Sequence, residues 1–255
     1  MATSKKKKPA AHVDRPLLNI IVPVYNEKDN FERLYNEVQL KIKQPKELFV
    51  VYDFDEDNTL PVARKIVRKD ATVHLIKNTI GRGPLNAIKS GFAAVESGPC
   101  LVVMADLSDD LSMVDAMYQA YLGGAHVVCG SRYMKGGRQI GGPWLKRTLS
   151  RLAGTSLYYV RGVPTHDVTN NFKLYDKQLL DCITIESTGG FELAMEVTVK
   201  AFRLGARISE LPTTWRDREA GASNFKLWKW LPSYLHWYWF AFGRRARTSH
   251  GASGK

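Results

Sequence analysis

The feature that most constrains the fold is an alternation of apolar, strand-like runs with helix-like segments over roughly the first 130 residues. The strand-like runs are 17–27, 47–59, 71–78, 100–110 and 125–133. The segments between them repeat apolar residues at helical spacing, as Phe31, Leu34 and Val38 do after the first run. Because near-continuous apolar strands that alternate with helices are typical of a sheet buried on both faces, we expect an α/β fold with a mostly parallel sheet.

The second half of the chain is less regular but continues with the same kinds of element. Helical spacing covers 143–162 and 189–205, and strand-like runs lie at 165–175 and 206–215. A chain of 255 residues is long enough for one sizeable core. The patterns divide it into a basic, disordered tail (1–15), one α/β domain (16–223), an amphipathic helix for a membrane interface (224–245) and a flexible tail (246–255).

Four of the predicted strands end in polar clusters, which read "YNE", "YDFDED", "ADLSDD" and "GSRY". Parallel strands end at the same edge of a sheet, and ligands of open α/β sheets bind beyond that edge. Each acid taken alone is explained equally well as a helix cap or a solvated turn. The four clusters together favour a single site at the carboxyl edge of the sheet.

The residue types in these clusters suit a diphosphate and a divalent cation. Asp106, Ser108 and Asp109 offer hard oxygen ligands, which are the ligands that Mg²⁺ and Mn²⁺ prefer. Arg132 and Arg147 supply positive charge from the segment after the fifth strand. A diphosphate leaving group is stabilised by this combination of a cation and arginines, so we expect Mg²⁺ or Mn²⁺ as the cofactor.

The net charge of +12 is concentrated at the two ends of the chain. Residues 1–15 contain five Lys or Arg and one Asp, and residues 216–255 contain eight Lys or Arg and two acids. The C-terminal end also carries the aromatic stretch "LWKWLPSYLHWYWF". Aromatic and basic residues in sequence favour an anionic membrane surface, although a helix docked on the protein itself explains the aromatic residues too.

Other partners and compartments are disfavoured by missing patterns. No helix-turn-helix, zinc finger or aromatic RNA-binding signature is present, so we expect no nucleic acid as partner. No apolar run approaches the roughly 20 residues of a membrane span, and Cys100, Cys129 and Cys182 are too far apart for a CxxC pair. We therefore expect a cytoplasmic, peripherally membrane-associated protein with free thiols. The oligomeric state is left open.

Several motifs resemble one known family. "IIVPVYNEKDN" resembles the opening strand of the inverting GT-A glycosyltransferases of family 2, and "GSRYMKGG", "THDVTNNFKLY" and "RDREAGASNF" resemble later segments of the dolichyl- and polyprenyl-phosphate mannose synthases. The likeness runs from about Leu18 to Phe225. It implies a GT-A fold, a nucleotide-sugar donor carrying GDP or UDP, and a lipid phosphate as acceptor.

The resemblance also implies roles for individual residues. Those expected to be catalytic are Asp106, Arg132, Arg147 and Arg218, and the metal ligands are Asp106, Ser108 and Asp109. Those expected to bind substrate are Pro23, Tyr25, Glu27, Asp53, Asp57, Asp167, Glu192 and Ser223. Met104 replaces the first acid of the family's metal pair, so we expect Asp106 to be the central ligand, with Ser108, Asp109, the diphosphate or water completing the shell.

Three functions remain open on the sequence alone. The first is sugar transfer from a nucleotide sugar to a polyprenyl or dolichyl phosphate at the cytosolic face of a membrane. The second is a soluble glycosyltransferase that acts on a glycan or a small molecule, for which Glu192 is the candidate base. The third is a nucleotide-sugar-binding protein without activity, suggested by Met104 and by Tyr52 in place of another family acid.

Overall fold

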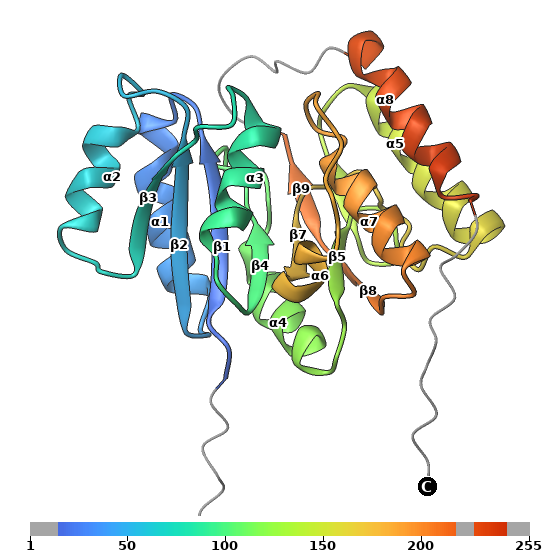
Figure 1. The fold of residues 1–255 in the computed structure, drawn as a ribbon, viewed down its shortest axis with the longest axis horizontal. Coiled ribbons are helices and arrows are strands. Elements are labelled where there is room, and N and C mark those ends of the chain that lie inside the picture. The colour runs from blue at the N-terminus through green and yellow to red at the C-terminus, as the bar shows by residue number, and fades with distance from the viewer. Residues whose placement is uncertain (1–14, 218–226, 244–255) are drawn as a thin grey trace, which may run out of the picture.

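The computed structural model describes residues 15–217 and 227–243, arranged around one seven-stranded sheet (Figure 1). The strand order is β3-β2-β1-β4-β7-β5-β8. The strands are β1 (Leu18–Val24), β2 (Lys46–Tyr52), β3 (Val73–Lys77), β4 (Pro99–Val102), β5 (Val127–Ser131), β7 (Lys173–Asp176) and β8 (Ile208–Pro212). Neighbouring strands pair in parallel except at β7, which is antiparallel to both β4 and β5. The mostly parallel α/β fold is confirmed.

The reversed direction of β7 has a consequence for the ligand edge. All the other strands of the sheet end at that edge, whereas β7 begins there. The loop of residues 165–172 therefore reaches the same edge as the segments that follow β1, β2, β4 and β5. A second, two-stranded sheet pairs β6 (Arg138–Ile140) with β9 (Thr214–Arg216). It joins the segment that follows β5 to the segment that follows β8.

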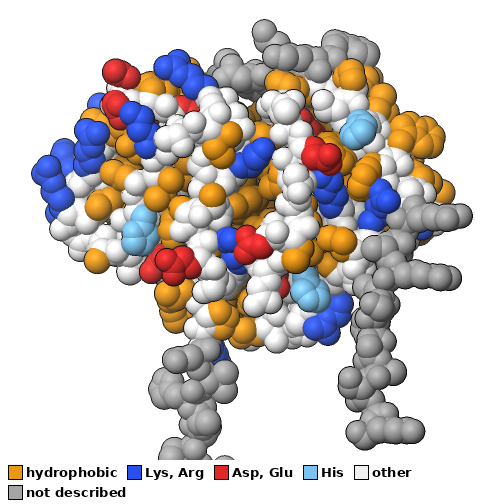
Figure 2. Space-filling view, viewed as in Figure 1, with side chains coloured by type: hydrophobic (Ala, Val, Ile, Leu, Met, Phe, Trp, Pro, Cys, Tyr) orange, Lys and Arg blue, Asp and Glu red, His pale blue; other side chains and the backbone are white. Residues whose placement is uncertain are grey.

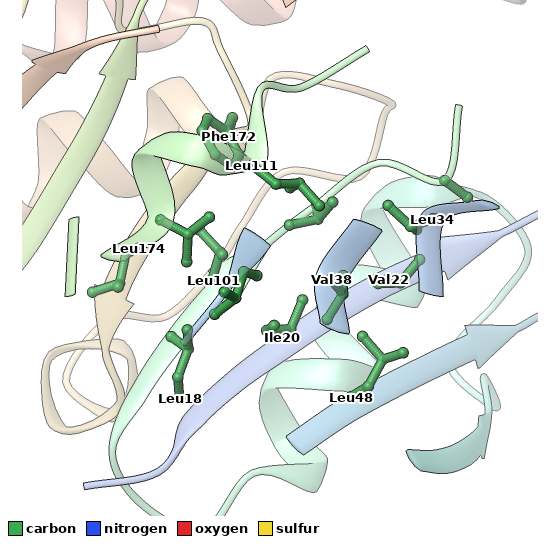
Figure 3. Packing of buried hydrophobic residues seen from close by; sticks show 14 of the residues in the cluster. Leu18, Ile20, Val22, Leu34, Val38, Leu48, Leu101, Leu111, Phe172 and Leu174 are labelled. Atoms are coloured by element: carbon green, nitrogen blue, oxygen red, sulfur yellow. The ribbon is translucent and has the colours of Figure 1, made fainter. Parts of the chain in front are cut away.

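One face of the main sheet is covered by α1 (Lys28–Lys41), α2 (Leu60–Val67), the short helix η1 (Leu111–Met113) and α4 (Val114–Leu122). Alternate residues of β1, Leu18, Ile20 and Val22, point to this face and are fully buried (Figure 3). They pack with Leu34 and Val38 of α1. The helical spacing seen in the sequence is thus the buried stripe of α1.

The opposite face is covered by α3 (Pro84–Ala94), α6 (Lys177–Asp181) and α7 (Leu193–Arg203). Ile21 of β1 points to this side, and its neighbour across the interface is Gly91 of α3. A Cβ atom on Gly91 would lie 2.4 Å from a methyl group of Ile21, so the glycine allows α3 to approach the sheet closely. Cys100 and Cys129 are buried in this core as free thiols, and Cys182 is exposed.

A third layer lies outside α7 and consists of α5 (Trp144–Ser156), the π-helical turn η2 (Leu157–Arg161) and α8 (Leu227–Phe240) (Figure 1). Trp237 of α8 packs among Leu157, Met195 and Phe202. The Tyr238 hydroxyl donates to Ser156 Oγ at 3.0 Å, which joins α8 to α5. Among the helices of the described residues, none has the length and hydropathy that crossing a bilayer requires.

The predicted boundaries of the domain and its tails stay predictions. Both predicted tails fall almost entirely outside the described residues, and so does the stretch 218–226 that precedes α8.

Candidate functional site

Asp57 and the segment after β1 lie together at the carboxyl edge of the sheet. Asp57 is 1% exposed, and its carboxylate accepts hydrogen bonds from the backbone N–H of Asn26 at 3.1 Å and of Thr59 at 2.8 Å. The N–H of Glu27 donates to Thr59 Oγ1 at 2.9 Å. These bonds support Asn26 at a φ of 55°, a left-handed conformation that is uncommon outside glycine. Asp57 therefore holds the loop that presents Tyr25 and Glu27.

Asp53 ties the end of β2 to the start of α3. Its carboxylate accepts from Asn78 Nδ2 at 2.7 Å and from the N–H of Gly83 at 2.8 Å. Two residues that the sequence analysis missed lie beside it: the ring of Phe54 meets that of Tyr25 edge-on at 5.6 Å, and the Arg82 guanidinium lies 5.4 Å from the Phe54 ring centre. Tyr25 is 58% exposed, so this side of the edge offers aromatic surface to a planar ligand. Pro23 is buried in β1.

The loop after β4 brings the three predicted metal ligands together. The N–H of Ser108 donates to Asp106 Oδ1 at 3.2 Å, and Leu107 between them has a φ of 60°. A non-glycine residue in this left-handed conformation is strained, and such strain concentrates at functional loops. The N–H of Arg216 donates to the carbonyl of Ser108 at 3.0 Å, so β9 supports the loop from outside.

Asp109 folds back toward the position of the missing family acid. Its Oδ2 atom accepts from the N–H of Met104 at 3.3 Å, and its side chain is buried. Burial, followed by the nearby charge of Asp106, raises the pKa of Asp109 to about 7. Two carboxylates that repel each other in a buried loop are the arrangement that a divalent cation relieves.

The polar atoms of this loop include one that is suited to a cation. The Ser108 Oγ atom is buried without a hydrogen-bond partner among the described residues, which leaves one oxygen available beside Asp106 and Asp109. Within residues 15–217 and 227–243, no three His, Cys, Asp or Glu side chains are grouped as a complete metal site. The loop therefore fits Mg²⁺ or Mn²⁺ only as a partial shell of two carboxylates and a hydroxyl, which Mg²⁺ commonly accepts together with phosphates and waters.

Arg132, directly after β5, is paired with Asp167 in the loop that precedes β7. The Arg132 side chain donates to both Asp167 oxygens at 2.7 and 2.9 Å, and both side chains are largely buried. Burial by itself lowers the pKa of Arg132, but the Asp167 carboxylate holds it above its ordinary value. Burial likewise favours the neutral form of Asp167, yet Arg132 keeps the pKa of that carboxyl below its usual range. Both groups are thus charged and hold each other in place.

A pocket of about 660 Å³ lies next to this pair, between the β5–β6 segment and α5. Its cationic lining residues are Arg132, Lys135, Arg138, Arg147 and Arg151. Apart from Arg132, none of these cations has a carboxylate within 4.0 Å in the part of the chain that the structure describes. This cationic pocket has the charge of a phosphate site.

Arg151 was missed by the sequence analysis, although one signal pointed to it. It follows Arg147 by four residues, and residues four apart lie on the same face of a helix.

Glu192 directly precedes the first residue of α7. It is 1% exposed, and its two oxygens accept from the N–H groups of Gly189 at 3.0 Å and Gly190 at 2.8 Å. Arg218 and Ser223 lie outside the described residues, so the roles expected for them stay predictions. The roles in substrate binding and catalysis expected for the described residues stay predictions too.

Comparison with known proteins adds an independent line of argument. Residues 19–184 match the family described as glycosyl transferase family 2. The polyprenol monophosphomannose synthase of Mycolicibacterium smegmatis is 29% identical over 211 residues, which is 80% of this chain and 79% of that protein. The dolichol-phosphate mannosyltransferase of Pyrococcus furiosus is 26% identical over 214 residues, which is 82% of this chain but only 59% of that protein.

Solved structures agree on the fold. Glucosyl-3-phosphoglycerate synthase from Mycobacterium tuberculosis, solved with Mn²⁺, uridine diphosphate and glucosyl-3-phosphoglycerate, superposes with a TM-score of 0.65 at 15% identity. The match covers 91% of this chain and 82% of that one. Since the family match also covers well over half of the chain, the resemblance read from the motifs is confirmed: this protein belongs to glycosyl transferase family 2 and is a glycosyltransferase of the GT-A fold.

Proposed function

We propose that this glycosyltransferase moves a sugar from a nucleotide-sugar donor to a polyprenyl phosphate at the surface of a membrane. The observation that carries the proposal is the cationic pocket beside the Arg132–Asp167 pair, whose lining includes Leu152, an exposed leucine of α5. A polyprenyl phosphate combines the two kinds of group that such a place would bind, an anionic phosphate and an apolar chain. The similar synthases of Mycolicibacterium smegmatis and Pyrococcus furiosus are named for mannosyl transfer to polyprenol and dolichol phosphates, which favours mannose as the sugar.

The outer face of α5 and η2 exposes several large hydrophobic side chains to solvent. Trp144, Leu152, Tyr159 and Val160 are between 60% and 74% exposed. Trp144, Arg151, Leu152 and Tyr159 recur at helical spacing, so arginine and apolar side chains share one face.

The neighbouring helix α8 adds a second apolar stripe. Leu235 and Trp239 of α8 are 47% and 65% exposed, and hydrophobic side chains reach the surface on this side of the molecule (Figure 2). Aromatic, aliphatic and basic side chains mixed in this way suit the interface between headgroups and acyl chains.

The chemistry follows from the charges. An acceptor phosphate is ionised near neutral pH and needs no strong base to attack the anomeric carbon. The bond from the anomeric carbon to the acceptor oxygen forms while the bond to the donor diphosphate breaks, and the leaving nucleoside diphosphate gains negative charge. Arg147 and Arg151 would neutralise the phosphates, and Arg132 is held by Asp167 at the same pocket.

Mg²⁺ or Mn²⁺ would be held by Asp106, Asp109 and Ser108. When bound, a divalent cation would supply Lewis-acid stabilisation of the leaving diphosphate. The residues of the chain have the remaining tasks: the Asp57 loop presents Tyr25 to the nucleoside, and the β9 strand holds the loop of Asp106.

The experiment is a transfer assay with a polyprenyl phosphate in detergent, Mn²⁺, and a panel of GDP- and UDP-sugars. We expect a glycosylated lipid with at least one donor. Replacing Arg151 by Gln is expected to raise the KM for the lipid phosphate about tenfold or more, the cost of one charge-assisted hydrogen bond. Arg64→Gln on α2, an exposed arginine far from the pocket, is the matched control and leaves that KM unchanged. Transfer to soluble glycans, with no lipid product from any donor, would contradict the proposal.

A further inference from the structure

The inner face of α8, the last of the described helices along the chain, packs against the turn that holds Glu192. Trp230, Tyr234, Trp237 and Ala241 recur at helical spacing, and Trp237 and Ala241 are buried. Figure 1 shows α8 lying along the outside of the molecule beside α5. Its inner stripe is packed on α7 and on the segment that leads into α7.

Two contacts seat α8 on that segment. The Trp230 ring covers the glycine pair: a Cβ atom on Gly189 would lie 2.5 Å from a ring carbon, and one on Gly190 would lie 3.2 Å from the ring. A side chain at position 189 would collide with this ring, and one at position 190 would push against it. About two turns further on, Trp237 Nε1 donates to Ser187 Oγ at 2.9 Å.

The same glycines hold Glu192. Their N–H groups donate to the two oxygens of its carboxylate, and a Cβ atom on Gly189 would also lie 2.5 Å from Glu192 Oε1. The ring of Trp230 and the carboxylate of Glu192 therefore enclose the same turn. A displacement of the ring would move the N–H groups that orient the carboxylate.

The loop that carries Asp167 packs against the same two helices. Val168, the residue after Asp167, is buried in one cluster with Met195 of α7 and Trp237 of α8. Burial also raises the pKa of the Tyr234 phenol of α8, so this hydroxyl stays neutral at the same boundary.

We propose that α8 is a positioning element of the sugar-transfer site, in which Trp230 fixes the turn of residues 189–192 and, through it, the Glu192 carboxylate. A carboxylate has about four acceptor positions, so Glu192 keeps capacity for a hydroxyl group of the transferred sugar after its two bonds to the turn. The inference rests on the proposed function, because it assigns a task in the same transfer reaction.

The first test does not depend on activity. Amide hydrogen exchange is measured at Gly189 and Gly190 in the full chain, in Trp230→Leu and in Tyr238→Phe. We expect exchange about tenfold faster in Trp230→Leu, because the turn loses its cover. Tyr238→Phe is the matched control, since its hydroxyl is bonded to Ser156 on α5 instead, and it leaves exchange at the turn unchanged. Unchanged exchange in a folded Trp230→Leu protein would overturn the proposal. Should that variant not fold, the milder Trp230→Phe takes its place in the same comparison.

The second test separates positioning from general stability. Trp230→Phe is expected to lower kcat for transfer to polyprenyl phosphate about tenfold while the KM for the nucleotide sugar stays unchanged. In a Glu192→Gln background the same replacement should lower kcat no further, because both changes act on one group. Independent, multiplicative effects would overturn the proposal. A protein that transfers no sugar to a lipid phosphate, yet exchanges at the turn as expected, would refute the proposed function and leave the positioning by α8 intact.

Discussion

At the scale of single residues, Asp109 is the side chain whose chemistry the fold changes most. An exposed aspartate ionises near pH 4, but burial and the charge of Asp106 raise the pKa of Asp109 to about 7. The hydrogen bond from the Met104 N–H acts in the opposite direction and lowers the pKa, so burial and the charge of Asp106 outweigh it. Such a residue destabilises the metal-free protein at high pH, and the proposed cation would offset this loss.

The pH dependence of stability gives the first prediction. The folded chain holds the Asp109 proton more strongly than the unfolded chain, so its free energy of unfolding falls as pH rises from about 4 to about 7. Asp109→Asn cannot ionise and escapes this loss. Thermal unfolding without metal should show the variant and the wild type alike near pH 4, and the variant more stable above pH 7 by about 4 kcal/mol, at 1.36 kcal/mol for each unit of the pKa shift. A constant difference across this range would contradict the burial of an ionisable Asp109. Mn²⁺ should narrow the gap by stabilising the wild type alone.

The Arg132–Asp167 pair gives the second prediction. Asp167→Ala leaves a buried guanidinium without its partner, which should lower the free energy of unfolding by roughly 3–5 kcal/mol in urea titrations. Asp55→Ala is the matched control, because its partner Lys77 and Asp55 itself are both about half exposed, and such pairs contribute on the order of 1 kcal/mol or less. Equal losses in the two variants would mean that the buried pair does not anchor the loop before β7.

At the scale of elements, α5 buries little and exposes large apolar side chains. Its buried side is small, and Gly154 fits against the backbone of His166, where a Cβ atom would lie 2.0 Å from the carbonyl oxygen. Its outer side carries Trp144 and Leu152 at 69% and 60% exposure, next to Arg147 and Arg151 of the pocket. A surface of this kind is costly in water and is stabilised by contact with an apolar phase.

Membrane binding through α5 gives the third prediction. Leu152→Glu should reduce sedimentation with anionic vesicles several-fold, because it removes apolar contact and adds a repelled charge. Leu40→Glu on α1 replaces a leucine of similar exposure (69%, against 60% for Leu152) on the opposite side of the molecule and serves as the matched control. If both variants bound vesicles like the wild type, the outer face of α5 would have no part in membrane contact.

At the scale of the whole molecule, the site is assembled from segments that are far apart in the chain. Tyr25 and Phe54 come from the ends of β1 and β2, and the loop of Asp106 follows β4. The cationic pocket is lined by the chain from β5 to α5. A nucleotide sugar that reaches from the first to the last of these would connect both halves of the sheet. Its binding should therefore stabilise the fold as one unit.

Ligand-dependent melting gives the fourth prediction. A nucleoside diphosphate with Mn²⁺ at about a hundred times its Kd should raise the Tm by several degrees, since a ligand of the native state adds roughly 2.7 kcal/mol at that concentration. EDTA should abolish the shift, and Asp106→Ala should weaken it strongly. A shift of the same size in EDTA would contradict the metal role of the loop, and the response to GDP or to UDP identifies the nucleotide.

The sequence by itself determined the order of strands and helices and the convergence of polar residues on one edge, because periodicity and strand direction are local properties of the chain. It also identified Asp106, Ser108 and Asp109 as neighbours, since they share one short loop.

Only the tertiary structure decided which distant groups meet. The antiparallel insertion of β7 between β4 and β5 brings Asp167 to Arg132, 35 residues earlier in the chain. The packing of α8 on α7 brings the Trp230 ring onto Gly189 and Gly190, whose N–H groups hold Glu192. The raised pKa of Asp109 likewise depends on burial by several elements. These contacts are set by the packing of whole elements, and no pattern of neighbouring residues records them.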